Sequence, residues 1–222
     1  MRRCFVFAAG KRCGLRQYPQ EGDLVIAADA GYRYCQEEDI IPDLLIGDFD
    51  SMEIPEDFPN SEHRPHVERR PIEKDDTDTM LALKVGLSWH CDTFYIYGGL
   101  GGERLDHALA NLQSLLYLRR RGAAGYLYEE NFVWTVVENE ALNIPRSVPD
   151  GLLSVFSLTE RSEGVTLSGL RYPLSEGVLT AEFPLGVSNH FTAEKALIRV
   201  RKGALLVGWE LPPVPDDEYA DE

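Results

Sequence analysis

The fold is decided by residues 94–107, FYIYGGLGGERLDH. Phe94–Tyr97 is a short apolar run typical of a buried strand, and Leu105–Arg120 carries apolar residues at helical spacing. The four glycines between them let backbone N–H groups approach an anion closely, although a plain flexible turn is the alternative. Neither the GxxxxGK[ST] nor the GxGxxG spacing is present. We therefore expect an anion-binding loop that is neither a P-loop nor a dinucleotide fingerprint.

The same alternation of strand and helix extends toward the N-terminus. Cys4–Ala9, Leu24–Ala28 and Leu44–Ile46 are further buried-strand runs, and Thr77–Trp89 has helical spacing. Alternating strands and helices predict a doubly wound, mostly parallel sheet.

After Gly125 the pattern changes to short runs separated by turn residues, without a helical repeat. This change predicts a second, all-β domain. The predicted fold class is therefore α/β, with an N-terminal doubly wound sheet domain followed by a C-terminal β-sandwich domain. The expected bounds are 1–128 for the first domain, 129–212 for the second, and 213–222 for an acidic disordered tail.

The composition restricts the possible partners. With 22 Lys and Arg against 37 Asp and Glu, the net charge is −15, which disfavours nucleic acid and favours a cationic small molecule. No apolar run approaches the roughly 20 residues that span a bilayer, so no membrane partner is expected. The four cysteines form no CxxC pair. The cytoplasm is the expected location.

Acidic residues follow the ends of predicted strands. Asp29 lies in Ala28-Asp29-Ala30-Gly31, and Asp48 and Asp50 lie in Gly47-Asp48-Phe49-Asp50-Ser51. In an open α/β sheet this edge binds ligands. Two carboxylates one residue apart can converge on one Mg²⁺ ion, although Asp and Gly also make ordinary turns and caps.

Two segments begin predicted helices with charged residues. Lys74 and Asp78 lie in Glu73-Lys74-Asp75-Asp76-Thr77-Asp78, where capping explains the acids but not the lysine. A phosphate held by Lys74 and free helix N–H groups would explain it. At the second helix start, we expect the side chains of Arg104, Asp106, His107 and Asn111 to face the ligand.

In order, these segments resemble the thiamine pyrophosphokinase family. Pro42–Ser51 matches its PDxxxGDFDS signature, and Lys74–Asp78 is similar to its KDxTD motif. Asp29-Ala30-Gly31 resembles its DAG turn, Gly101–His107 its GGRxDH motif, and Ser188-Asn189 the SN pair of its C-terminal domain.

The resemblance implies transfer of a pyrophosphoryl group from ATP to thiamine, giving thiamine diphosphate and AMP. It also implies a homodimer with active sites where the subunits meet. The roles that it implies are Mg²⁺ binding by Asp48, Asp50 and Asp78; phosphate and nucleotide binding by Lys74, Arg104, His107 and Asn111; orientation of the substrates by Asp29 and Asp106; and thiamine binding by Ser188, Asn189 and Trp209.

The sequence departs from the family pattern at Glu103, which makes the glycine-rich loop one residue longer before Arg104. Two other functions share these motifs. A related pyrophosphokinase for another heterocyclic alcohol, such as a hydroxymethylpterin, would differ at Ser188-Asn189. A non-enzymatic nucleotide or vitamin sensor is expected to lose metal carboxylates, which this sequence keeps.

Overall fold

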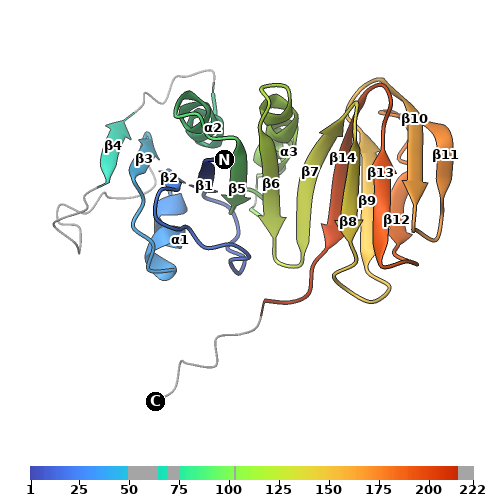
Figure 1. The fold of residues 1–222 in the computed structure, drawn as a ribbon. Coiled ribbons are helices and arrows are strands. Elements are labelled where there is room, and N and C mark those ends of the chain that lie inside the picture. Colours follow the sequence, from blue (N-terminus) through green and yellow to red (C-terminus); the bar gives the residue numbers. More distant parts are fainter. Residues whose placement is uncertain (50–64, 70–75, 103, 215–222) are drawn as a thin grey trace, which may run out of the picture.

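A computed structural model describes residues 1–49, 65–69, 76–102 and 104–214 of the 222-residue chain (Figure 1). Of the predicted site residues, Asp50 and Lys74 lie outside the described residues. The inserted Glu103 and the tail from residue 215 onward lie outside them as well. None of the helices described is long and apolar enough to cross a membrane.

The N-terminal half contributes six parallel strands to a ten-stranded sheet whose order is β12-β9-β14-β7-β6-β5-β1-β2-β3-β4. Both β1 and β2 are buried along most of their length, as the apolar runs predicted. The six strands are β1 (Arg3–Phe7), β2 (Leu24–Ala28), β3 (Leu44–Gly47), β4 (His66–Arg69), β5 (Thr93–Tyr97) and β6 (Ala124–Glu129).

Helices cover both faces of the parallel strands (Figure 1). Alternate residues of β1 show the two faces: Val6 packs with the core under α2 (Asp78–Ser88) and α3 (Leu105–Arg119), and Phe7 packs with the core under α1 (Gly31–Glu37). The two predicted helices are confirmed, and α1 is an addition. The first half is therefore doubly wound.

The C-terminal half continues the same sheet with antiparallel strands and adds a second sheet. An apolar core between the two sheets contains Val137, Val155, Val165, Ile198 and Leu205, all nearly or fully buried. The strands that extend the large sheet are β7 (Phe132–Glu138), β14 (Ala204–Glu210), β9 (Leu152–Ser157) and β12 (Gly186–His190). The second sheet has the order β11 (Leu174–Thr180), β10 (Arg161–Ser168), β13 (Lys195–Arg199) and β8 (Ala141–Pro145).

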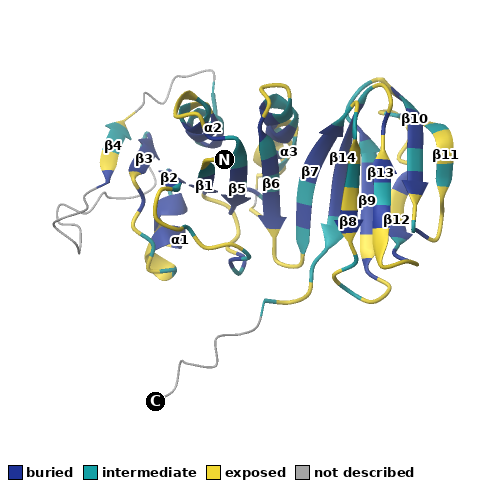
Figure 2. Ribbon diagram, in the orientation of Figure 1, coloured by how far each residue is buried: buried dark blue, intermediate teal, exposed yellow. Residues whose placement is uncertain are grey.

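The large sheet crosses the expected domain boundary without a break. The β6–β7 hairpin pairs Glu129 with Phe132. Strand β7 therefore provides hydrogen-bond partners for the backbone groups along the edge of β6. Figure 2 shows exposed residues instead on β4 and β11, at the outer edges of the two sheets. The α/β class is confirmed, whereas the division into two domains at 128/129 stays a prediction.

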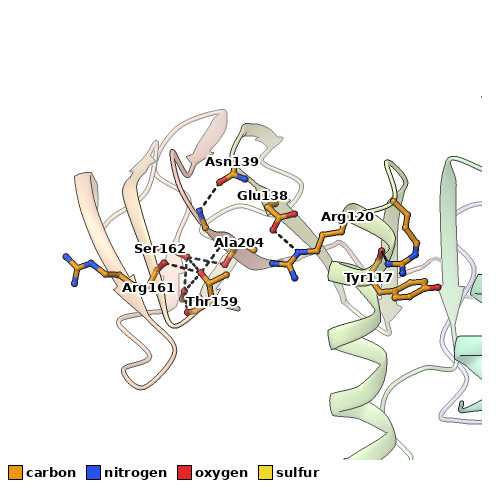
Figure 3. A network of polar contacts seen from close by, with 11 residues as sticks. Tyr117, Arg120, Glu138, Asn139, Thr159, Arg161, Ser162 and Ala204 are labelled. Atoms are coloured by element: carbon orange, nitrogen blue, oxygen red, sulfur yellow. Dashed lines mark hydrogen bonds and ion pairs between the residues drawn. The ribbon is translucent and has the colours of Figure 1, made fainter. Parts of the chain in front are cut away.

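At the amino-terminal edge of the parallel strands, a polar network ties the two halves together (Figure 3). The Arg120 guanidinium, at the end of α3, donates to Glu138 of β7 at 3.0 Å. Beside it, the Asn139 side chain accepts a hydrogen bond from the Gly203 N–H at 2.9 Å. The Arg120–Glu138 hydrogen bond therefore joins α3 to the second half.

Candidate active site

The strand order reverses between β1 and β5, and a cavity lies at their carboxyl ends. Strands β2 to β4 lie on one side of β1, and β5 and β6 lie on the other. The carboxyl ends at such a switch point are where open α/β sheets bind ligands. The cavity measures about 230 Å³ and is lined by Ala8–Gly10, Ala28–Asp29, Thr77–Thr79, Gly98–Gly99, Gly102, Arg104, His107, Ala108 and Asn111.

Backbone hydrogen bonds join the two loops that form the floor of this cavity. The Gly10 N–H donates to the Gly98 carbonyl at 2.6 Å, and the Lys11 N–H donates to the Leu100 carbonyl at 3.0 Å. A Cβ on Gly10 would lie 2.4 Å from the Gly98 oxygen, and Gly98 itself has φ +66°. Because no side chain fits there, glycine brings loop backbone to the cavity surface.

The N-termini of two helices line the cavity. Helix α2 is capped by the Thr77 hydroxyl, which accepts from the Met80 N–H at 3.1 Å. Helix α3 has no side-chain cap at Arg104. Since helix N-termini carry partial positive charge and free N–H groups, both ends favour an anion.

The cavity also holds carboxylates. Asp29 and Asp78 line it together. Asp29 has φ +49°, its N–H donates to the Ile46 carbonyl at 2.8 Å, and Gly47 packs against its Cα. Asp48 is half-buried after Gly47 and is not a lining residue. No three His, Cys, Asp or Glu side chains form a metal-binding group within the described part of the chain, which omits Asp50.

Arg104 and Asp106 form a bidentate pair at the start of α3. The guanidinium donates through Nε and an Nη to the two carboxylate oxygens at 2.9 and 2.5 Å. These hydrogen bonds lower the pKa of Asp106 to about 2 and raise the pKa of Arg104. Both side chains are exposed. The pair therefore presents an oriented guanidinium beside the cavity.

Asn111 acts on the glycine-rich loop. It is 6% exposed and donates to the Gly99 carbonyl at 2.8 Å. His107, one turn earlier, lines the cavity and is exposed. Sequence reasoning placed both residues on the ligand-facing side of the helix. Both residues line the cavity, and Asn111 holds the loop.

Ser188 and Asn189 lie in β12. The register of β12 against β9 shifts between Gly186 and Asn189, and Ser188 has φ +55°. The Asn189 side chain is 3% exposed, donates to the Tyr172 carbonyl at 2.8 Å and accepts from the Tyr172 N–H at 2.9 Å. Its amide therefore fixes a neighbouring loop, while Ser188 is exposed.

Two tryptophans face opposite sides of the large sheet. Trp209 pairs with Val133 and Leu153, both buried, and packs against the cores on that face. Trp134 pairs with Gly208 instead, so its ring lies on the other face. Sequence reasoning singled out Trp209 and missed Trp134, because no local pattern reveals which face a ring takes.

Trp134 lines a second, larger cavity of about 430 Å³ that sequence reasoning did not foresee. Other lining residues are Leu100, Gly101, Glu129, Phe132 and Glu210. Glycine-rich loop residues thus line both cavities.

Comparison with known proteins identifies the family. The family model described as "Thiamin pyrophosphokinase, catalytic domain" matches residues 15–127, more than half of the chain. The chain belongs to the thiamin pyrophosphokinase family. Membership in this family makes it an enzyme, a kinase. A second model of the family, for its vitamin B1 binding domain, matches residues 140–205.

Relatives and solved structures agree with this assignment. The chain is 30% identical over 195 residues to thiamine pyrophosphokinase of Bacillus subtilis, covering 87% of this chain and 90% of that protein. The crystal structure of thiamine pyrophosphokinase from B. subtilis has a TM-score of 0.81 at 26% identity, covering 95% and 99% of the two chains. A family protein from Enterococcus faecalis gives 0.77 at 26% identity, covering 96% and 100%.

The two family segments divide the site residues between them. The catalytic segment contains Asp29, Asp78, Arg104 and the glycine-rich loop, and the vitamin B1 binding segment contains Ser188 and Asn189. Trp134 lies between the two segments, and Trp209 lies beyond the second.

Proposed function

We propose that the chain transfers the pyrophosphoryl group of ATP to the hydroxyl of thiamine, giving thiamine diphosphate and AMP. Family membership supports this reaction. The observation that carries it at residue level is the cavity at the β1–β5 switch point, where two helix N-termini meet carboxylates and a glycine-rich loop.

The triphosphate binds at this cavity in our proposal. The ends of α2 and α3 and the loop backbone attract its charge, and Arg104, oriented by Asp106, neutralises part of it. His107 and Lys74 complete the nucleotide contacts. Phosphoryl transfer depends mainly on alignment and charge neutralisation, so these groups supply most of the catalysis.

Mg²⁺ is the proposed metal, held by Asp48, Asp50 and Asp78. The donor chemistry fits, since Mg²⁺ prefers carboxylate oxygens together with phosphate oxygens, and Asp78 lines the cavity. When bound, the ion would neutralise phosphate charge. Asp29, in the same cavity, would orient the reacting groups.

Thiamine contacts come from Ser188, Asn189 and Trp209 in our proposal, within a homodimer whose active sites lie between subunits. Since the Asn189 amide binds Tyr172, the exposed Ser188 hydroxyl is the member of this pair that is able to reach a ligand.

We place the enzyme in the cytoplasm, where the four cysteines, all free and buried, would stay reduced.

The reaction is tested by measuring AMP release from ATP with and without thiamine. We expect AMP to appear only with thiamine, in step with thiamine diphosphate. AMP release that requires a hydroxymethylpterin, or release independent of any alcohol, would contradict the proposal.

Asp78→Asn tests the carboxylate at the cavity. We expect kcat to fall at least about a hundredfold, because losing a metal ligand removes several kcal/mol of charge stabilisation. The matched control is Asp76→Asn, two residues earlier, where the carboxylate pairs with Lys84 at 2.6 Å and does not line the cavity. Equal loss in both variants, or none in Asp78→Asn, would contradict the assignment.

A further inference from the structure

Two carbonyl groups of the glycine-rich loop are held by the connection between β1 and β2. The Gly98 carbonyl accepts from the Gly10 N–H at 2.6 Å, and the Leu100 carbonyl accepts from the Lys11 N–H at 3.0 Å. Residues 8–23 of this connection form no helix, so their N–H groups need partners outside their own segment. The glycine-rich loop supplies two of these partners, and the two loops therefore support each other.

The carbonyl between these two is held from α3. The Gly99 carbonyl accepts from the Asn111 side-chain amide at 2.8 Å, and Asn111 is 6% exposed. A Cβ on Gly99 would lie 3.4 Å from the amide nitrogen and 2.5 Å from Leu127 of β6. The loop thus fits closely between α3 and β6. Because α3 buries Leu115 and Leu118 further along, Asn111 projects from a fixed helix.

The occupied carbonyls determine how the peptide groups of the loop are turned. In a planar trans peptide, the N–H of the next residue points to the side opposite the carbonyl. The Gly99 carbonyl faces Asn111, so the Leu100 N–H points away from α3. In the described part of the chain, the N–H groups of Leu100 and Gly101 donate to no protein acceptor. Such backbone N–H groups in a loop are available to an anion.

The loop's own sequence does not fix this orientation. Glycine adopts positive and negative φ with similar ease, and Gly98 and Gly101 have φ values of +66° and +71°. A rotated Gly99–Leu100 peptide would exchange the positions of the carbonyl and the N–H, and would present a partial negative charge in place of a donor. The hydrogen bond from Asn111 opposes that rotation, because it requires the carbonyl to face α3.

We infer that Asn111 is a positioning residue, whose amide fixes the Gly99–Leu100 peptide so that the loop N–H groups stay available to the phosphates of ATP. The inference rests on the proposed function and adds to it. It also replaces the role that the resemblance implied for Asn111, direct binding of the nucleotide, with support of the loop that binds the phosphates.

The direct test is amide hydrogen exchange in the full chain without any ligand. The N–H groups of Gly10 and Lys11 are the reporters, because they donate to the loop carbonyls on either side of Gly99. We expect exchange at both to rise at least about fivefold in Asn111→Leu, which is similar in shape and uncharged. Asn111→Asp has no donor when ionised and should have the same effect.

Ser114→Ala is the matched control. Ser114 is 2% exposed on the same helix, and its hydroxyl donates to the Asn111 backbone carbonyl at 2.6 Å. The variant removes a buried hydrogen bond from α3 but leaves the Asn111 side chain on the loop. We therefore expect exchange at Gly10 and Lys11 to stay at the wild-type rate.

Steady-state kinetics tests the consequence for the substrates. Both Asn111 variants should raise the KM for ATP at least about tenfold and the KM for thiamine less than about threefold. Ser114→Ala should change neither by more than about twofold. A purely structural role would lower Tm and raise both KM values equally, and would contradict the inference.

The exchange rates separate the inference from the reaction, because they are measured without substrate. Wild-type exchange at Gly10 and Lys11 in both Asn111 variants would overturn the inference, since a residue that only contacts the nucleotide leaves the unliganded loop unchanged. Faster exchange in Asn111→Asp alone would assign the effect to the added charge and would overturn it as well. The proposed function fails separately, if the wild type releases no AMP from ATP and thiamine.

Discussion

The Asp106 carboxylate is held by both hydrogen-bonding edges of the neighbouring Arg104 guanidinium. With a pKa lowered to about 2, Asp106 is a weak base at neutral pH. It is therefore better suited to orienting Arg104 than to taking a proton from the attacking hydroxyl.

We predict that Asp106→Asn raises the KM for ATP about threefold to tenfold and changes the KM for thiamine less, because an exposed bidentate pair contributes modestly. Steady-state kinetics with each substrate varied in turn checks this. The matched control is Glu163→Gln, which breaks an exposed pair of the same spacing with Arg161 on β10. Kinetic changes in the control, or a larger effect on thiamine, would contradict the role.

The stability that the Arg104–Asp106 pair contributes to the folded state depends on pH. The folded-state pKa of Asp106 is lowered from its usual value near 3.9, so the pair contributes stability above that value. The contribution is lost only as the pH falls toward about 2. The difference in Tm between wild type and Asp106→Asn should therefore be constant from about pH 5 upward and shrink below about pH 4. A step in that difference near neutral pH would assign the titration to another group.

At the scale of elements, the turn before β14 leads into Ala204, which belongs to the network in Figure 3. Gly203 has φ +117°, and a Cβ there would lie 2.6 Å from the Ser162 hydroxyl. Ser162 is fully buried and its hydroxyl lies 2.8 Å from that of Ser157. The neighbouring atoms therefore have little room to move.

We predict that Gly203→Ala lowers the free energy of unfolding by about 2–4 kcal/mol, combining backbone strain with overpacking. In a chain of this size that lowers Tm by roughly 5–15 °C. Gly122→Ala isolates the strain, because Gly122 has φ +79° and nothing within 4 Å of a Cβ. Gly122→Ala should lower the free energy of unfolding by about 1–2 kcal/mol. Thermal melts measure both variants. Equal losses of stability in Gly203→Ala and Gly122→Ala would show that the contact with Ser162 does not contribute to the effect.

At the scale of the whole molecule, apolar residues are exposed beside the candidate active site. Leu105 and Leu109, on the first turns of α3, are 71% and 54% exposed. They follow Arg104 directly, at the helix end that lines the cavity. A second subunit that covers them would close the site from outside, in agreement with the proposed dimer.

We predict a dimer at micromolar concentration by light scattering, and a monomer with impaired activity for Leu109→Asp, because burying an unpaired carboxylate is costly. The control is Ile41→Asp, at an aliphatic residue that is 42% exposed between α1 and β3. It should remain dimeric. A fully active monomeric wild type would exclude an active site shared between subunits.

The sequence alone determined the elements whose signals are local. The strand–glycine loop–helix unit at residues 94–107 was predicted because apolar period and glycine content act over a few residues. The same reasoning placed Asp29 and Asp48 at the carboxyl ends of strands, and Asp29 lines the cavity at that edge of the sheet, whereas Asp48 does not. The motifs occur in this sequence in the same order as in the family, and this resemblance supplied the expected reaction.

Only the tertiary structure decided features that depend on pairing between distant strands. The continuous sheet follows from the β6–β7 hairpin, and the Asn189 amide binds a loop 17 residues away in sequence. The pairing of Gly208 with Trp134 places that ring, and not Trp209, at a cavity wall. A shift of one residue in strand register exchanges the two faces of a sheet, and nothing in the local sequence fixes that register.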